Sequence, residues 1–273
     1  MIKAVFIDID GTLVNDKREI SDNTLIAIRK CIDNNIKIIL ASGRSRLQTS
    51  EYQERIGGSP YTISSNGADI YDLEKNKEIY IENIPKSVLE VLFEFANKNE
   101  YKITLNYDFE LSMNTMFYPD EQDRVKSKEY LKDVIEKRKV VQCVISNRDI
   151  EKIRVFKNFL EEEKIGLKIE NESKKLRDSS LPPSKHYYCD LVSKNASKGE
   201  AVKKVCEYLN LKNNEIAAIG DGINDVTMFK LTPYSIAMGN AGNIVKENAN
   251  YATDSNNDDG VAKILNKILK NEL

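Results

Sequence analysis

Short apolar runs alternate with helix-length segments in the first and last parts of the chain. The runs occupy residues 4–7, 36–41, 61–64, 216–219 and 235–238. Between them, segments such as 21–32 and 197–209 place apolar residues three and four positions apart, as one buried face of a helix requires. A strand followed by a helix, repeated, predicts a parallel sheet with crossover helices. We therefore predict an α/β fold with a Rossmann-like core.

Two of these helices have recognisable N-terminal signals. Ser21 stands directly before the first helical segment, where a serine hydroxyl can accept a hydrogen bond from the helix backbone. Ser197 and Glu200 have the three-residue spacing of a capping box. The second helix is therefore expected to begin at Lys198.

The middle of the chain has a different order of elements. A helix starting at Pro85 is followed by strand-like pieces, a second helix and further strand-like pieces. They lie at 103–107, 109–113, 140–145, 149–163 (the helix), 167–169 and 186–191, and the polar segment 171–185 is predicted to be a loop. This order favours an open α+β layer inserted into the core. We place the core at 1–82 and 191–273, and the inserted domain at 83–190.

Composition narrows the function classes. The 273 residues are 41% hydrophobic, which suits a folded protein, and the formal net charge of -2 gives no general attraction to nucleic acid or anionic membranes. The four cysteines form no CxxC pair, and no apolar run approaches the length of a membrane span. We expect a cytoplasmic protein, a monomer or weak homo-oligomer, that binds neither nucleic acid nor membranes.

Polar residues follow several predicted strands directly. They are Asp8, Asp10, Ser42, Asn66, Asp221 and Asp225. In an open parallel sheet the carboxyl ends of the strands border the ligand crevice, so these distant residues are expected to meet there. Gathered carboxylates repel one another unless a cation joins them, and a set of oxygen ligands suits Mg²⁺.

Further residues point to a phosphate ligand. Lys198 adds a positive charge at the predicted start of a helix, where free backbone amides favour anions. Ser42 and Gly43 offer a hydroxyl and an unhindered amide at another strand-to-helix turn. A metal, a lysine and free amides together indicate a phosphate-binding site.

Four motifs then resemble those of the haloacid dehalogenase superfamily of phosphatases. They are DIDGT at 8–12, SGR at 42–44, Lys198 and GDGIND at 220–225, in that order along the chain. SSNGA at 64–68, MGNA at 238–241, TDSNNDDGVA at 253–262 and the long insertion resemble its Cof-type branch, which carries a large α/β cap. The resemblance covers essentially the whole chain and is strongest in the core.

The resemblance implies a reaction and roles for individual residues. Asp8 would attack phosphorus and form an aspartyl-phosphate, and Asp10 would act as general acid and then as general base. Mg²⁺ would be held by the carboxylates of Asp8 and Asp221 and the backbone carbonyl of Asp10, with Asp225 supporting it directly or through water. The remaining residues would hold the phosphoryl group: Ser42, Gly43, Lys198 and Asn224. The substrate would be a small phosphorylated metabolite, such as a sugar phosphate or a phosphorylated cofactor.

Simpler or different interpretations stay open at this level. An Asp-Gly pair after a strand can be an ordinary turn, Asn66 and Asn240 fit turn residues equally well, and residues 256–260 fit a loop before a helix. A phosphomutase of the same superfamily would use the same aspartate pair. A non-catalytic protein that binds phosphorylated metabolites is the alternative from another class, although it has no need of a nucleophile.

Overall fold

The computed structural model describes residues 1–107, 115–117, 124–172 and 187–273. The predicted strand at 109–113 lies outside these residues, as does nearly all of the predicted loop at 171–185. Within the described residues the chain forms two compact units. The first consists of Met1–Tyr80 and Ala196–Leu273, and the second of Ile81–Asn195.

The second boundary differs from the one drawn on the sequence. A division after residue 190 would cut strand β10, Tyr187–Ser193, which is paired antiparallel with β8 on one side and β9 on the other. The strand therefore stays whole within the second unit. The first boundary, placed after 82 on the sequence, falls after Tyr80 in the structure.

The first unit is built on an eight-stranded sheet in the order β13-β12-β11-β1-β2-β3-β4-β5. The strands are β1 Ala4–Ile7, β2 Lys37–Ala41, β3 Tyr61–Ser64, β4 Asp69–Asp72, β5 Lys77–Ile81, β11 Ile216–Gly220, β12 Tyr234–Ala237 and β13 Tyr251–Ala252. β1 lies in the middle and pairs parallel with β11 and β2. Six strands run parallel, and five of them are at the predicted positions, whereas β13 was not predicted. β4 joins β3 antiparallel and extends the sheet in a way that the sequence did not predict.

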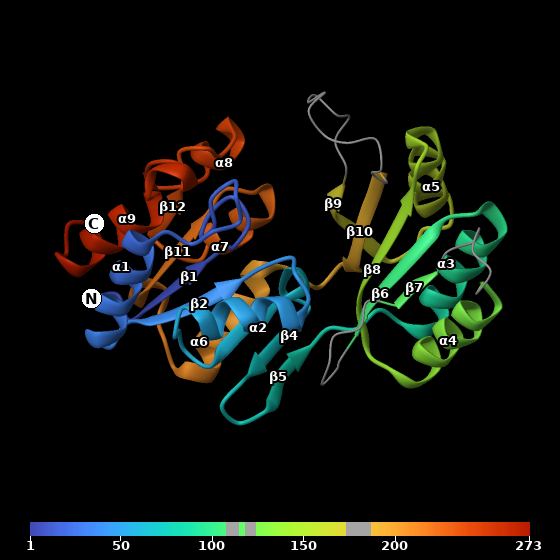
Figure 1. Cartoon of the computed structure of the whole chain (residues 1–273), viewed down its shortest axis with the longest axis horizontal. Coiled ribbons are helices and arrows are strands. Elements are labelled where there is room, and N and C mark those ends of the chain that lie inside the picture. The colour runs from blue at the N-terminus through green and yellow to red at the C-terminus, as the bar shows by residue number, and fades with distance from the viewer. Residues whose placement is uncertain (108–114, 118–123, 173–186) are drawn as a thin grey trace. The chain divides into compact units, whose positions relative to one another are not determined.

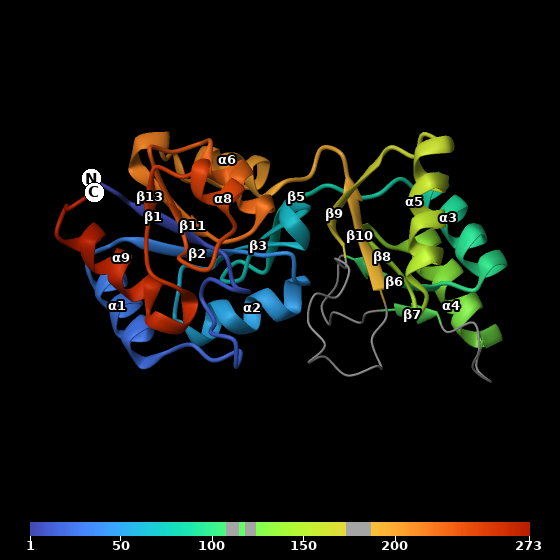
Figure 2. The same cartoon turned by 90° about the horizontal axis from the view of Figure 1, so that it is seen from above.

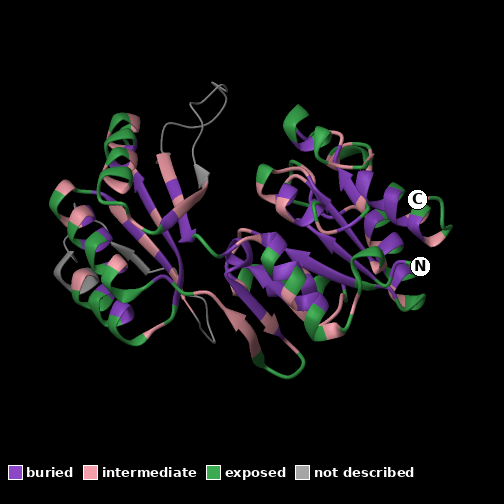
Figure 3. Ribbon diagram, turned by 180° about the vertical axis from the view of Figure 1, so that it is seen from behind, coloured by how far each residue is buried: buried purple, intermediate pink, exposed green. Residues whose placement is uncertain are grey.

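Helices cover both faces of this sheet, so its central strands are buried throughout (Figure 3). They are α1 Asp22–Asp33, α2 Arg46–Arg55, α6 Lys198–Leu209, α7 Val226–Phe229, α8 Asn243–Glu247 and α9 Gly260–Leu269. Alternation along β1 sends Val5 and Ile7 into the cluster that holds α1 and α9, and Phe6 into the cluster that holds α6. Figure 2 shows α1 and α9 on one side of the strands and α6 on the other.

The second unit has a five-stranded sheet in the order β7-β6-β8-β10-β9, and every pair in it is antiparallel. Its elements are α3 Lys86–Asn99, β6 Lys102–Tyr107, β7 Thr115–Phe117, α4 Arg124–Lys137, β8 Val140–Asn147, α5 Ile150–Glu162, β9 Leu167–Glu172 and β10 (Figure 1). Apolar residues of the three helices pack with inward residues of β6, β8 and β10 in one core. The α/β fold with a mostly parallel core and a separate α+β insertion is thus confirmed.

The predicted helix starts are observed. The Ser21 side chain accepts a hydrogen bond from the backbone of Thr24, and the Ser197 side chain accepts one from the backbone of Glu200. Both helices begin at the residue after the serine, and Lys198 is therefore fixed in the first turn of α6. In the described part of the chain, no helix has the length and apolar character that a membrane span needs.

Candidate active site

The loop after β1 turns sharply and brings Asp8 to the carboxyl end of the central strand. The backbone amide of Leu13 donates to the carbonyl of Asp8 at 3.2 Å, which closes the turn. Gly11 has a φ of +79°, a conformation that favours glycine. A Cβ atom there would lie 2.5 Å from an Asp221 carboxylate oxygen. The turn can therefore approach Asp221 only because residue 11 is glycine.

Lys198 lies between two carboxylates. Its Nζ atom is 2.5 Å from Oδ1 of Asp8 and 2.6 Å from Oδ1 of Asp225. The side chains of Lys198 and Asp225 are completely buried, and that of Asp8 is 8% exposed. An ammonium group is held in the interior only when it is paired, so these three residues form one charge cluster.

The loop after β11 wraps around the carboxylate of Asp225. Its Oδ2 atom accepts hydrogen bonds from the backbone amides of Asp221 at 3.0 Å and Gly222 at 2.8 Å. A Cβ atom on Gly220 would lie 2.4 Å from the carboxylate, which explains the glycine at that position. Asp225 thus shapes the loop with one oxygen and pairs with Lys198 through the other.

Asp221 points toward the β1 loop. Its Oδ1 atom accepts a hydrogen bond from the buried hydroxyl of Thr12 at 2.8 Å, and its Oδ2 atom lies 3.4 Å from the amide nitrogen of Asn240. One ligand atom from each of Asp8, Asp221 and Asp225 lies within 4.8 Å of the others. Three carboxylates at such spacing are a suitable oxygen donor set for a hard divalent cation.

Burial and mutual repulsion alter the acidity of this cluster. Burial raises the pKa of Asp8 to about 8; Lys198 opposes that rise, and Asp225 and Asp221 add to it. Burial also raises the pKa of Asp221 to about 6, although the Thr12 hydrogen bond acts in the opposite direction. Burial by itself would lower the pKa of Lys198, but Asp225 and Asp8 more than offset this and raise it. A bound cation would favour the ionised carboxylates.

Asp10 is separate from the three clustered carboxylates. Its side chain is 55% exposed and accepts two hydrogen bonds from Arg44, from Nε at 2.7 Å and from Nη2 at 2.6 Å. The Arg44 guanidinium also lies over the ring of Tyr52, 5.0 Å from its centroid. The pair is a two-point contact between the loop that follows β1 and the loop that follows β2.

Ser42, Gly43 and Asn224 meet through Asn66. Asn66 is buried, its backbone amide donates to the Ser42 carbonyl at 3.0 Å, and its side-chain oxygen accepts from Nδ2 of Asn224 at 3.0 Å. A Cβ atom on Gly43 would lie 2.9 Å from the same side-chain oxygen. Ser42 is not the N-cap of α2, because Ser45 occupies that position.

The structure therefore links most of the residues that the sequence singled out for the site, whereas the Asp10 side chain lies apart from them and pairs with Arg44. Contacts run from Ser42 through Asn66 and Asn224 to the loop of Asp225, and from there through Lys198 to Asp8. Sequence reasoning did not assign Thr12 or Arg44 a role and gave Asn66 and Asn240 only weak weight. Their signal was present in the motifs DIDGT, SGR, SSNGA and MGNA, but a motif does not show which partner a side chain will contact.

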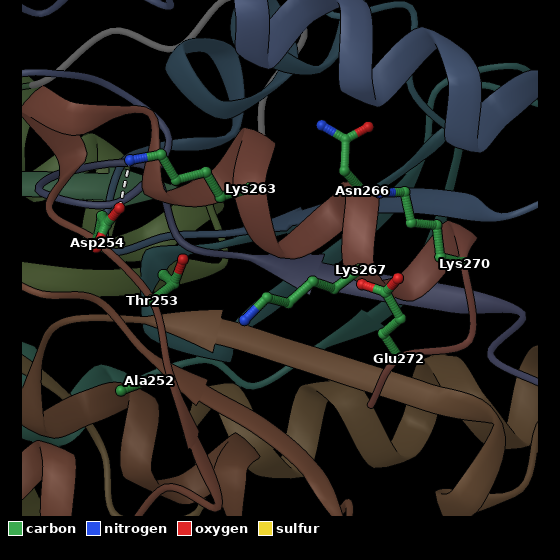
Figure 4. Close-up of a pocket in the computed structure, with 8 residues that line it drawn as sticks. All are labelled: Ala252, Thr253, Asp254, Lys263, Asn266, Lys267, Lys270 and Glu272. Atoms are coloured by element: carbon green, nitrogen blue, oxygen red, sulfur yellow. Dashed lines mark hydrogen bonds and ion pairs between the residues drawn. The ribbon is translucent and has the colours of Figure 1, made fainter.

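A hollow of about 640 Å³ lies elsewhere on the first unit and shares no residue with the site. It is bordered by Ala252, Thr253, Asp254, Lys263, Asn266, Lys267, Lys270 and Glu272 (Figure 4). Figure 4 shows Lys263 turned toward Asp254, with which it forms an ion pair. Most of the polar groups that border this hollow come from an exposed, lysine-bearing face of α9 and from the residues just after it.

Comparison with known proteins settles the family. The model of the haloacid dehalogenase-like hydrolases matches residues 5–265. The chain belongs to this family. The predicted resemblance to its Cof-type branch is thereby confirmed. The prediction of a phosphatase enzyme is confirmed as well, because similar proteins are named phosphatases.

Named relatives and solved structures of the family span nearly the whole chain. The chain is 29% identical to the Bacillus subtilis 5-amino-6-(5-phospho-D-ribitylamino)uracil phosphatase YcsE, over 97% of this chain and 94% of that protein. It is 26% identical to the Bacillus subtilis phosphatase YwpJ, over 98% and 100%. A haloacid dehalogenase-like hydrolase from Bacteroides thetaiotaomicron matches with a TM-score of 0.79 and 28% identity, covering 98% of this chain and 100% of its own.

Proposed function

We propose that this protein is a Mg²⁺-dependent phosphomonoesterase that acts on small phosphorylated metabolites through a phosphoryl-Asp8 intermediate. The observation that carries the proposal is the buried cluster of Asp8, Lys198 and Asp225 beside Asp221, at the carboxyl end of the central strands. Burying this carboxylate beside two further acids is costly when one ammonium group is their only cation, unless a functional ligand binds.

In the proposed reaction, a carboxylate oxygen of Asp8 attacks phosphorus and the bond between phosphorus and the ester oxygen breaks. Asp10 gives its proton to the departing alkoxide, so that the alcohol leaves neutral. Asp10 then takes a proton from water, the water oxygen attacks phosphorus, and the bond to Asp8 breaks. The sum is an ester and water converted to an alcohol and inorganic phosphate, with both aspartates restored.

The other residues orient and neutralise the phosphoryl group. Lys198 supplies a fixed positive charge beside Oδ1 of Asp8, the proposed nucleophile. The Ser42 hydroxyl, the Gly43 amide and the Asn224 side-chain amide are proposed to hold the remaining phosphoryl oxygens. Asn66 fixes Asn224 and Ser42 relative to one another through its two hydrogen bonds.

The donor set fits Mg²⁺. Asp8 and Asp221, with the backbone carbonyl of Asp10, would hold the ion, and it would neutralise charge on the phosphoryl oxygens when bound. Both oxygens of Asp225 are already engaged, one by Lys198 and one by loop amides, which favours a supporting role for this residue. Asp8 must be ionised to attack, and Lys198 favours that form.

The relatives support a proposal for the substrate class. The name of one relative specifies a phosphorylated ribitylaminouracil, which is a small phosphate monoester. We propose a substrate of similar size, a sugar phosphate or a phosphorylated cofactor precursor. The second unit, Ile81–Asn195, is proposed to act as the cap that selects the alcohol part of the substrate.

The test is phosphate release from an aryl phosphate and from a panel of sugar and cofactor phosphates. Wild type, Asp8→Asn and the exposed control Asp33→Asn are compared with Mg²⁺ and with excess chelator. We expect turnover in wild type and the control, and none with chelator or in Asp8→Asn. Full activity of Asp8→Asn, with its intact mass confirming that the amide persists, would refute the proposal. Turnover that needs a bisphosphate and releases no net phosphate would replace it with a phosphomutase.

A further inference from the structure

The TDSNNDDGVA motif at 253–262 has no part in the reaction proposed above, yet its asparagines contact the β1 loop directly. Asn256 donates from its side-chain amide to the Val14 carbonyl at 3.0 Å and to the Asp16 carboxylate at 3.2 Å. Asn257 forms a two-point contact with Asp16: Nδ2 donates to the carboxylate at 3.0 Å, and Oδ1 accepts from the Asp16 backbone amide at 3.1 Å.

Asn240, three residues after the end of β12, connects this segment to the site. Its side-chain amide donates to the Gly11 carbonyl at 2.8 Å and lies 3.4 Å from Oδ2 of Asp221. Its side-chain oxygen accepts from the backbone amide of Asn256 at 3.0 Å. Asn240 therefore touches the Gly11 turn, the Asp221 carboxylate and the 253–260 segment at once.

The segment that presents these asparagines is itself held firmly. The Thr253 hydroxyl donates to the Gly260 carbonyl at 2.8 Å, and the Gly239 amide donates to the Asp254 carbonyl at 3.0 Å. A Cβ atom on Gly260 would lie 2.1 Å from the Asp254 carbonyl oxygen, so the close approach requires glycine. The segment is thus tied to the end of β12 and to the start of α9 by specific contacts, and is more than a connection between them.

We propose that Asn240 and Asn256 are positioning residues of the active site. Together with Asn257 they form an asparagine bridge, through which residues 253–260 hold the 11–16 turn and the Asp221 carboxylate in their working arrangement. The bridge touches neither the nucleophile nor the proposed phosphate ligands. Its kinetic consequence rests on the proposed function, whereas its effect on the order of the 11–16 turn does not.

The proposal predicts a specific kinetic pattern. Asn256→Ala and Asn240→Ala should each lower kcat about three- to tenfold, the range that follows from losing one or two hydrogen bonds. The KM for substrate should stay within about twofold of wild type, because the bonds lost do not reach the substrate. Asn240→Ala should also raise the Mg²⁺ concentration that gives half-maximal activity by about three- to tenfold, because it frees Asp221.

A second variant tests whether the contact itself matters. Asn256→Asp places a carboxylate against the Asp16 carboxylate and should impair kcat more than Asn256→Ala does. Adding Asp16→Asn restores an amide-to-carboxylate contact in the reverse direction, and it should recover part of the lost rate. The matched control is Asn250→Ala, whose exposed side-chain amide donates to the Pro233 carbonyl at 2.8 Å in the same unit. The control should leave kcat and the Mg²⁺ requirement unchanged.

Hydrogen exchange of the metal-free, full-length protein tests the bridge without any turnover. The amides of Leu13, Val14 and Asn15 donate to the carbonyls of Asp8, Ile9 and Glu19, which flank the turn, and so report its order. In Asn256→Ala their exchange should be about three- to tenfold faster than in wild type or Asn250→Ala. Unchanged exchange would overturn the proposal, whether or not the protein hydrolyses phosphate esters. Faster exchange with unchanged kcat in an active enzyme would also overturn it, since the bridge would then support the fold alone.

Discussion

Replacing Lys198 by methionine tests the charge balance of the site. The substitution keeps an unbranched apolar side chain, one atom shorter than lysine, but removes the ammonium group. It leaves Asp8 and Asp225 in a buried environment without their shared cation. Breaking a buried ion pair by removing one partner costs about 3–5 kcal/mol. For a domain of the size of the first unit, this corresponds to a melting temperature lower by roughly 6–20 °C.

The penalty should depend on pH in a definite direction. In the metal-free protein the pKa of Asp8 is raised to about 8 from a reference of 3.8, so the folded state keeps a proton that the unfolded state releases. Stability therefore falls as the pH rises through that window. In Lys198→Met the attraction that holds this pKa down is gone. The fall then extends to higher pH, and the difference from wild type widens as the pH rises past 8.

The assay is denaturant and thermal unfolding in the presence of chelator, at pH values below and above 8. Lys203→Met is the matched control, because it makes the same substitution at an exposed position of the same helix. The control should stay within about 0.5 kcal/mol of wild type. If Lys198→Met also stays within about 1 kcal/mol of wild type at every pH, Lys198 does not neutralise the carboxylate cluster.

Three further substitutions probe other parts of the site and the sheet. Gly11→Ala should lower the free energy of unfolding by about 1–3 kcal/mol and weaken activation by Mg²⁺, because the new Cβ atom would lie 2.5 Å from Asp221. Denaturation and Mg²⁺ titration curves of the variant that match those of wild type would contradict this. Arg44→Met should change stability by at most about 1 kcal/mol, since the bridge to Asp10 is partly exposed. Because Arg44 fixes the carboxyl group of Asp10, the proposed general acid, its loss should slow turnover of alkyl phosphates more than of aryl phosphates, whose leaving groups need no proton. An equal effect on both classes of substrate would refute this. Arg46→Met should destabilise the protein by about 3 kcal/mol in chemical denaturation, because it leaves Asp69 buried and unpaired; a loss below about 1 kcal/mol would show that the pair is not needed.

The core of the fold could be predicted from the sequence because its signals are local. Apolar runs such as 4–7 and 216–219 became β1 and β11, which pair side by side in register. Serine caps at 21 and 197 fixed the helix starts within a residue. The family motifs placed Asp8, Lys198 and Asp225 at strand and helix ends, and the topology then brought them together.

The features that escaped prediction depend on distant or side-chain-specific contacts. The antiparallel addition of β4 follows a tight turn with positive φ at Ser65, Asn66 and Gly67, and hydrophobic periodicity does not report such a turn. The bidentate Arg44–Asp10 contact depends on side-chain conformers, which hydrophobic periodicity does not report. The asparagine bridge joins residues about 240 positions apart, where neither spacing nor composition gives a signal.

Mass spectrometry of the trapped enzyme tests whether Asp8 accepts the phosphoryl group. The variant Asp10→Asn is mixed with an aryl phosphate and Mg²⁺ and quenched in acid. The aryl leaving group departs without a proton, while loss of the base slows hydrolysis of the intermediate, so the intermediate should accumulate. We expect one added phosphoryl group on the peptide that contains Asp8, and none in the double variant Asp8→Asn, Asp10→Asn. A burst of aryl alcohol with an unmodified Asp8 peptide, or a phosphoryl group on another residue, would contradict it.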